Sequence, residues 1–138
     1  MRVSVVIPAF NEEELLPECL ESLRAQEYEG ELELLLVDNG STDGTARVAR
    51  RYGVTVVDEP HRGYGRALTA GFAAARGDII ACTDADSVVP PDWISSLVHE
   101  YQRRQDVVAI GGDVEFTCQN WKSRLLTRWF IPLFNRFD

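Results

Sequence analysis

The 138-residue sequence predicts an α/β domain built on a mostly parallel sheet with helices on both faces. The first observation is that short apolar runs alternate with longer segments of helical spacing. The second is that several runs are continuous in Val, Ile and Leu, which is typical of parallel strands buried on both faces. The third is that these runs end in acidic, amide or glycine residues. We therefore expect a polar site at the carboxyl edge of the sheet.

The pattern gives a strand or helix for most of the chain. Strands are expected at 2–7, 32–38, 54–58, 78–83 and 107–114, and helices at 12–26, 42–52, 64–75 and 92–104. Three glutamates open the first helix, where the helix dipole favours acids, and Pro17 either marks the start of that helix or distorts its first turn. The third helix is apolar nearly all round and is expected to be buried.

Composition excludes several classes of function. Hydrophobic residues make up 45% of the sequence, which is enough for a core, and a net charge of −8 argues against sequence-independent nucleic-acid binding. No apolar run is long enough to span a bilayer, and the first residues do not resemble a signal peptide. Cys19, Cys82 and Cys118 form no metal or disulfide pattern, and we expect Cys19 and Cys82 to be buried. These features lead us to expect a cytoplasmic protein.

The last residues differ from the rest, so we divide the chain into an α/β domain at 1–117 and a tail at 118–138. The tail holds four basic residues and one acid, whereas the domain is strongly acidic. Leu and aromatic residues recur at helical spacing over 121–137, which predicts an amphipathic helix. Its apolar face is expected to pack on the domain or on another surface. A second copy of the chain, as a homodimer, or peripheral contact with an anionic membrane would supply that surface.

Carboxylates gather where the strands end. Asp84 and Asp86 follow the apolar run 79–82, and Asp38 ends the run 34–37. Two carboxylates so close together need a positive partner, and a divalent cation such as Mg²⁺ takes one or two of them and leaves its other positions to phosphate oxygens and water. Asp, Asn and Gly are also common in turns for conformational reasons alone. That explanation suits one loop better than three, so we expect a site for a metal and a diphosphate.

Four segments in this order resemble the family 2 glycosyltransferases, inverting enzymes of the GT-A fold that use nucleotide-diphosphate sugars. The segments are 5–13, 37–45, 62–68 and the DxD sequence at 84–86. A lone DxD occurs by chance in many proteins, whereas four motifs in family order, each at a strand end, are specific. The resemblance runs from Val3 to about Val114, most of the chain.

The resemblance implies a role for each matching residue. The residues expected to contact the nucleotide sugar are Pro8, Ala9, Phe10, Glu12, Asp38, Gly63, Arg66 and Asp84. Asp38 would accept a hydrogen bond from the base, Asp84 would approach the ribose or the metal, and Asp86 would bind Mn²⁺ or Mg²⁺ directly. The metal would neutralise the charge that develops on the leaving diphosphate. The resemblance favours UDP over GDP, and the loop at 63–65 resembles that of transferases that use polyprenyl phosphates.

The sequence also departs from the family. His61 and Thr69 stand where many members have asparagine. In the family the carboxylate base lies well downstream of the DxD sequence, in an acceptor-binding half. We expect that half to lie outside this sequence, and the later acids Asp113 and Glu115 stand where the family has no base. No catalytic residue is assigned, and a nucleotide-binding module that needs a partner for catalysis stays open.

Two other enzyme classes fit less well. Residues 84–88 also satisfy the DxDx[TV] motif of haloacid dehalogenase-type phosphatases. That class needs a later lysine and a later acidic pair, whereas Lys122 is the only lysine and no acidic pair follows. A dinucleotide-binding oxidoreductase would carry a glycine fingerprint after the first strand, where this sequence has 8–11 instead.

Overall fold

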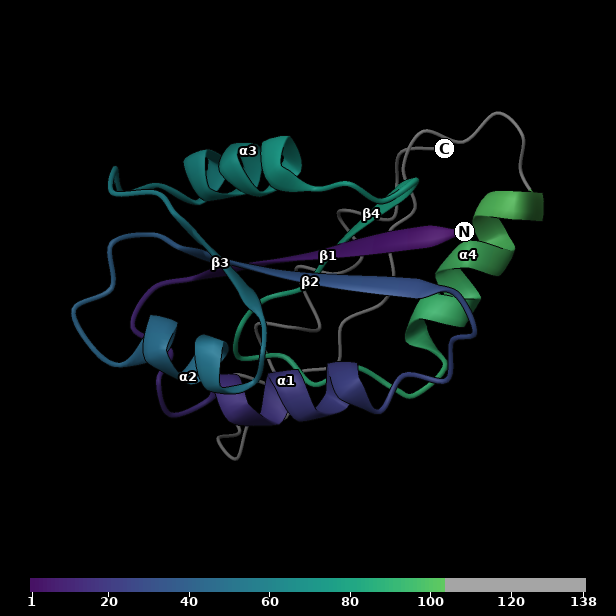
Figure 1. The fold of residues 1–138 in the computed structure, drawn as a ribbon, viewed down its shortest axis with the longest axis horizontal. Coiled ribbons are helices and arrows are strands. Elements are labelled where there is room, and N and C mark those ends of the chain that lie inside the picture. Colours follow the sequence, from purple (N-terminus) through teal and green to yellow (C-terminus); the bar gives the residue numbers. More distant parts are fainter. Residues whose placement is uncertain (104–138) are drawn as a thin grey trace, which may run out of the picture. The chain divides into compact units, whose positions relative to one another are not determined.

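A computed structural model describes residues 1–103 (Figure 1). Four parallel strands form one sheet in the order β3-β2-β1-β4. The strands are β1 (Arg2–Ala9), β2 (Glu31–Asp38), β3 (Thr55–Asp58) and β4 (Ile79–Cys82), and the helices are α1 (Leu16–Arg24), α2 (Thr45–Arg51), α3 (Tyr64–Ala74) and α4 (Trp93–Arg103). The predicted α/β class with a parallel sheet is confirmed. The predicted strand at 107–114, the tail helix and the boundary at 117 lie outside the described residues and stay predictions.

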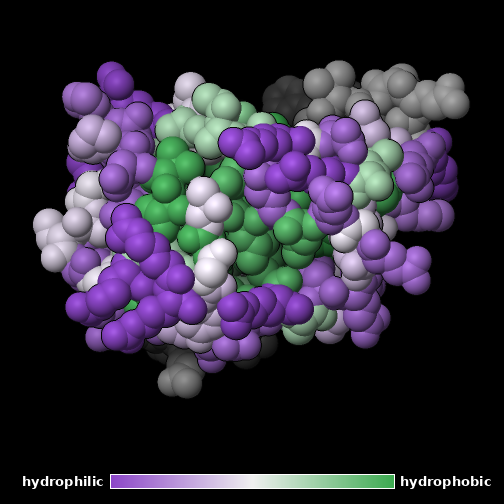
Figure 2. All heavy atoms as spheres, in the orientation of Figure 1, coloured by the Kyte–Doolittle hydropathy of each residue, from purple (hydrophilic) through white to green (hydrophobic). Residues whose placement is uncertain are grey.

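Helices cover both faces of the sheet, because strand side chains alternate between them. Figure 1 shows α3 on one face and α1 and α2 on the other. Val3, Val5 and Ile7 of β1 join the larger core with α1, and Val6 joins a smaller core under α3. In the same orientation, Figure 2 shows hydrophobic residues in the middle of the surface and hydrophilic residues around them. Within residues 1–103 no helix is long and apolar enough to cross a membrane.

The expectation that α3 is buried all round was wrong. Ala67 and Gly71 are buried against the sheet, whereas Phe72 is 46% exposed. Small residues on the inner side let the helix lie close to the strands, and a Cβ at Gly71 would come within 2.3 Å of Val6 Cγ1. Several of the other residues of the helix are alanines. Because alanine is apolar, the sequence predicted burial on every side, although so small a side chain is also common on exposed faces.

Two helices begin later than predicted. α1 begins at Leu16 with Pro17 in its first turn, so the three glutamates precede the helix, and the alternative of a start near Pro17 holds. Proline is tolerated there because the first N–H groups of a helix have no partner within it. α2 begins at Thr45, because Asp43 Oδ1 accepts hydrogen bonds from the backbone N–H and the hydroxyl of Thr45 and so forms a turn.

β1 runs two residues further than predicted, through Pro8 to Ala9. Proline has no N–H to donate, and within a sheet it needs a side without a partner strand. β4 pairs with β1 only from Val3 to Val6, so among the described residues no strand lies beside Pro8 on that side. The result is that Pro8 and Ala9 are buried strand residues rather than loop residues.

The prediction that the run 79–82 is a fully buried strand was also wrong. Ile80 is 41% exposed, and Cys82 is exposed rather than buried. β4 lies at the end of the strand order, so among residues 1–103 it has a neighbour on one side only. Hydrophobicity predicts the strand, but the place of a strand in the sheet depends on pairing that the run itself does not encode. Cys19 is buried, as predicted.

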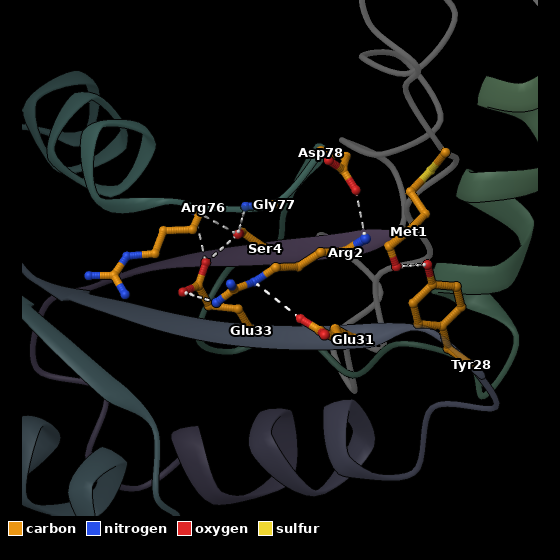
Figure 3. Close-up of polar contacts among 9 residues, drawn as sticks. All are labelled: Met1, Arg2, Ser4, Tyr28, Glu31, Glu33, Arg76, Gly77 and Asp78. Carbon is orange, nitrogen blue, oxygen red and sulfur yellow. Dashed lines mark hydrogen bonds and ion pairs between the residues drawn. The ribbon is translucent and has the colours of Figure 1, made fainter.

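A polar network fixes the amino edge of the sheet (Figure 3). Ser4, buried in β1, donates its hydroxyl hydrogen bond to Glu33 on β2 and accepts one from Gly77 N–H at 2.7 Å. Arg2 forms an ion pair with Glu33 at 2.9 Å, and Arg76 N–H donates to the same carboxylate. The hydrogen bond from Ser4 is the main reason that the pKa of Glu33 is lowered. The network ties the segment before β4 to β1 and β2.

Candidate functional site

The loops that follow β1 and β2 are joined by hydrogen bonds at the carboxyl edge of the sheet. Asn11 N–H donates to Ser41 Oγ at 3.0 Å, and Asn11 Oδ1 accepts from Thr42 N–H at 2.8 Å. Asn11 has a φ of +53°, a left-handed conformation that asparagine tolerates better than most residues. The two loops are thus held together as one surface.

The buried hydroxyl of Thr45 anchors Glu12 to the start of α2. Thr45 Oγ1 accepts a hydrogen bond from Glu12 N–H at 2.9 Å and donates to Asp43. Burial works to raise the pKa of Asp43, but hydrogen bonds from Thr45 and from Glu13 N–H lower it. Asp43 therefore stays ionised beside Glu12.

Asp38 ends β2 with one carboxylate oxygen in use. Its Oδ1 accepts a hydrogen bond from Ser41 N–H at 3.0 Å. None of the described residues donates to Oδ2, and the residue is only partly buried. One acceptor is therefore fixed in place at the strand end and another is left for a ligand.

Asn39 holds the loop that follows β3. Its amide donates to the carbonyls of Glu59 at 3.0 Å and His61 at 2.8 Å, and its Oδ1 accepts from Gly63 N–H at 2.8 Å. The side chain is buried, and all three bonds cross from one strand end to the next. They fix the backbone at Gly63, where φ is +145° and α3 is about to begin.

Phe10 and Arg62 form a second link between loops. The Arg62 guanidinium carbon lies 3.1 Å from the centre of the Phe10 ring. Phe10 is half-buried at the end of β1, and Arg62 is exposed in the loop before α3. Arg66, the other cation in this segment, is exposed in the first turn of α3 and pairs with no carboxylate among the described residues.

The DxD sequence forms the loop after β4. Ala85 is buried, whereas Asp84 and Asp86 on either side of it are exposed. Tyr64 donates its hydroxyl hydrogen bond to Asp84 Oδ1 at 3.2 Å, and the thiol of Cys19 contacts the Asp84 carbonyl at 3.5 Å. No described residue donates a hydrogen bond to the Asp86 carboxylate. The buried alanine thus anchors a loop that presents two carboxylates to solvent.

The electrostatics show that acids from three strand ends lie close together. Burial raises the pKa of Glu12, and Asp86, Asp43 and Asp84 raise it further. Burial also raises the pKa of the Cys19 thiol to about 12, with contributions from the same Asp86 and Asp84. Cys19 is therefore an un-ionised packing residue. The carboxylates repel one another, and a cation at this edge would relieve that repulsion.

A divalent cation fits the donors that are present. Asp84 and Asp86 offer two exposed carboxylates, and residues 1–103 contain no cluster of three or more potential metal-ligating side chains. Two carboxylates would suit a hard cation that takes one or two of them and completes its shell with phosphate oxygens and water. A hollow of about 300 Å³ beside this edge is lined by Asn11, Glu12, Glu13, Glu14, Leu15 and Asp43. Its acidic lining would repel a bare phosphate, so a diphosphate needs the cation.

The structure brings most of the predicted residues to one edge. Phe10, Glu12, Asp38, Gly63, Arg66, Asp84 and Asp86 all lie in loops or element ends at the carboxyl edge, whereas Pro8 and Ala9 are buried in β1. Sequence reasoning missed Asn39, Arg62 and Tyr64. All three stand in segments that resemble the family, but their contacts join residues far apart in the chain. No signal within these segments pointed to the contacts, because nothing in the sequence shows that the Asn39 amide is buried.

Comparison with known proteins identifies the family. The sequence model of the family described as glycosyl transferase family 2 matches residues 4–138. An uncharacterized glycosyltransferase of Mycobacterium tuberculosis (strain ATCC 25618 / H37Rv) is 44% identical over 106 residues, which are 77% of this chain and 46% of that protein. An undecaprenyl-phosphate 4-deoxy-4-formamido-L-arabinose transferase of Pseudomonas fluorescens (strain Pf0-1) is 36% identical over 90% of this chain. The match covers 40% of that transferase, so the chain spans less than half the length of these relatives.

Solved structures agree on the fold. The mannosyltransferase PcManGT of Pyrobaculum calidifontis, in complex with GDP-Man and Mn²⁺, has a TM-score of 0.68 and 35% identity over 72% of this chain and 32% of its own. Glucosyl-3-phosphoglycerate synthase of Mycobacterium tuberculosis, with Mn²⁺, UDP and glucosyl-3-phosphoglycerate, has a TM-score of 0.62 and 34% identity over 70% of this chain and 38% of its own. TarS of S. aureus, at 21% identity and a TM-score of 0.71, supports the fold alone.

Proposed function

The chain belongs to glycosyl transferase family 2, and from this premise we propose that its carboxyl edge binds the nucleotide-diphosphate part of a sugar donor for inverting transfer. The observation that carries the proposal is that acids from three strand ends act on one another: burial raises the pKa of Glu12, and Asp86, Asp43 and Asp84 raise it further. Nothing in residues 1–103 neutralises these acids. A donor that arrives with a divalent metal would do so.

Each strand end would contact a different part of the donor. The free Oδ2 of Asp38 would accept a hydrogen bond from an N–H of the base, beside the half-buried Phe10 ring. Glu12, held by Thr45, would face the ribose. Gly63 and Arg66 would lie along the diphosphate, where the positive charge of Arg66 and the N-terminus of α3 favour phosphate. Pro8 and Ala9 would support this surface from below, through their backbone.

Asp84 and Asp86 would hold the metal. Mn²⁺ or Mg²⁺ bound there would act as a Lewis acid toward the diphosphate leaving group. The Tyr64 hydroxyl, 3.2 Å from Asp84 Oδ1, would orient that carboxylate. The complexes of PcManGT and of glucosyl-3-phosphoglycerate synthase contain Mn²⁺, which supports a divalent metal here.

The donor is a UDP- or GDP-sugar, and the acceptor is a polyprenyl phosphate. The two complexes contain GDP-Man and UDP, so both bases occur among proteins of similar structure. For the acceptor, the support comes from relatives that match 90% of this chain. They include the undecaprenyl-phosphate transferase and a glucosyl-dolichyl phosphate glucuronosyltransferase of Haloferax volcanii, 37% identical over 131 residues. The catalytic base is not assigned to any residue of 1–103.

Titration calorimetry with UDP and GDP, with and without Mn²⁺, tests the proposal. We expect one of the two nucleotides to bind more tightly with Mn²⁺, and Asp86→Ala to remove most of that gain. Glu29→Ala, which removes an exposed carboxylate at the opposite edge, is the control and should change nothing. If neither nucleotide binds, or if Asp86→Ala keeps the full metal dependence, the proposal fails.

A further inference from the structure

Arg62 and Phe10 come from the two loops on either side of the end of β2, where Asp38 lies. Phe10 follows β1 and Arg62 follows β3, and β2 lies between these two strands in the sheet. Asn39 N–H bonds to the Ala9 carbonyl at 2.9 Å, and Glu59 N–H bonds to the Asp38 carbonyl at 3.0 Å, so both loops are tied to the end of β2. The guanidinium therefore meets the aromatic ring at the strand end where Asp38 offers its free oxygen.

Two further contacts fix the position of Arg62. The hydrogen bonds of Asn39 hold the residues on both sides of it, His61 and Gly63. Gly40 lies beneath its aliphatic stem, since a Cβ at Gly40 would stand 3.5 Å from Arg62 Cδ. Gly40 has a φ of +77°, which a residue with a side chain rarely adopts. A long, exposed side chain is thus held by Asn39 and Gly40, the two residues that follow β2.

The charge of Arg62 is not used in an ion pair with any described residue. Acids are abundant at this edge, and Arg47 nearby is paired with Glu13 at 2.7 Å. Arg62 instead lies over an aromatic face, which attracts a cation through the ring quadrupole. A guanidinium is a planar cation, and nucleic-acid bases stack on such planes.

We propose that Arg62 is a base-binding residue, on whose guanidinium, supported by Phe10, the nucleobase of the donor stacks. This inference rests on the proposed function, because it assumes that a nucleotide occupies the carboxyl edge. The base would then be held by two contacts of different kinds. Arg62 would contact its face, and Asp38 would accept a hydrogen bond from its edge. Contact of Arg62 with the diphosphate is the competing arrangement.

The experiment compares a nucleoside monophosphate with the diphosphate. Dissociation constants are measured by NMR titration for UMP and UDP, or for GMP and GDP if guanine is preferred, with Mn²⁺ absent and present. We expect Arg62→Ala to raise the dissociation constants of the monophosphate and of the diphosphate alike, by about tenfold, whether or not Mn²⁺ is present. Arg62→Lys should lose nearly as much affinity, because the lysine ammonium keeps the positive charge but is not a planar group on which a base can stack. Arg51→Ala, an exposed arginine in the last turn of α2, is the control and should bind like the wild type.

The outcomes separate this inference from the proposed function. Wild-type chain that binds no nucleotide overturns the proposed function, and the role of Arg62 with it. Wild-type binding together with unchanged binding by Arg62→Ala overturns the role of Arg62 alone. A loss that appears for the diphosphate but not for the monophosphate, and that Arg62→Lys restores, places Arg62 on the diphosphate and contradicts stacking. Arg62 is exposed, so its variants should fold, and circular dichroism confirms this before titration.

Discussion

Glu33 at the amino edge of the sheet is surrounded by hydrogen-bond donors, whereas Glu12 at the carboxyl edge is surrounded by other acids. Glu33 accepts from Ser4, Arg2 and the backbone of the segment before β4 (Figure 3), and its pKa is lowered, chiefly by the Ser4 hydrogen bond. Glu12 has its pKa raised by burial and then by Asp86, Asp43 and Asp84. The same sheet thus holds one carboxylate whose partners lie within the chain and one that faces other acids.

This difference between the two edges distinguishes residues that stabilise the fold from residues that we propose to bind a ligand. Polar groups that serve folding find partners within the chain, because an unpaired buried group is destabilising. The exposed carboxylates Asp84 and Asp86 raise the pKa of Glu12, and of the two only Asp84 accepts a hydrogen bond from a described residue, Tyr64. Under the proposed function, a metal-bound donor would supply the positive partner for these acids. This contrast can be tested one carboxylate or amide at a time.

The largest effect on stability is expected for Asn39, a buried residue of the carboxyl edge whose side-chain amide makes three hydrogen bonds. Asn39→Ala would leave two carbonyls and the Gly63 N–H without their partner, and we expect it to lower the free energy of unfolding by about 3 kcal/mol. Urea denaturation measures the loss. Ser41→Ala, which removes a single exposed contact to Asn11, should cost less than about 1 kcal/mol. Equal losses for the two variants would contradict the role given to Asn39.

Glu33→Gln tests the paired carboxylate at the amino edge. Because the folded pKa of Glu33 lies below its ordinary value of 4.5, the folded state favours the ionised form. Its contribution is full above the ordinary value and is lost as the pH falls through the lowered pKa. We expect the variant to lose about 2 kcal/mol at pH 7, and the loss to shrink in acid. Glu31→Gln on the same strand, an exposed residue, should stay within about 0.5 kcal/mol at every pH. A loss that is independent of pH would argue against the ionised carboxylate as its cause.

Glu12→Gln should change the free energy of unfolding in the opposite direction to Glu33→Gln, and by less than either of the other two substitutions. The folded pKa of Glu12 is raised, so its ionised form destabilises the fold once the pH exceeds the ordinary value. We expect the variant to be more stable than the wild type at pH 7 by about 0.5 kcal/mol, since the group is partly solvated. The gain should vanish below the ordinary value of 4.5, where the glutamic acid is neutral in both states. Thermal denaturation across this pH range measures it, with the exposed Glu14→Gln as control. A variant less stable than the wild type at pH 7 would contradict the crowding of acids.

The sequence predicted the parts of this contrast that are local. Strand ends and the DxD spacing can be recognised within a few residues, so Asp38, Asp84 and Asp86 could be placed at strand ends without the structure. Their binding of a donor or a metal stays a prediction. The sequence also indicated where α1 could begin, because Pro17 restricts the backbone whatever its surroundings. Exposure of Ile80 and Cys82 could not be predicted, because it depends on the strand order rather than on the hydrophobicity of the run.

The unpredicted parts of the site depend on pairs that are distant in the chain. Phe10 meets Arg62 only because β1 and β3 lie on either side of β2, and Asn39 reaches Gly63 across the same arrangement. The turn-rich sequence 39–44 gives no sign that its first residue is buried. Such contacts depend on the strand order, which cannot be recognised from a few neighbouring residues.

Paramagnetic line broadening by Mn²⁺ tests the contrast between the two edges most directly. A strand of eight residues spans about 26 Å, so a metal at one edge affects nearby amides far more strongly than those at the other. Mn²⁺ is added to the isotope-labelled chain with UDP or GDP, and amide signals are followed. We expect broadening first at 10–13, 39–44 and 84–87, while Ser4, Glu33 and Gly77 stay sharp. Broadening that begins at Ser4 and Glu33, or no selective broadening at either edge, would contradict a metal–nucleotide site at the carboxyl edge.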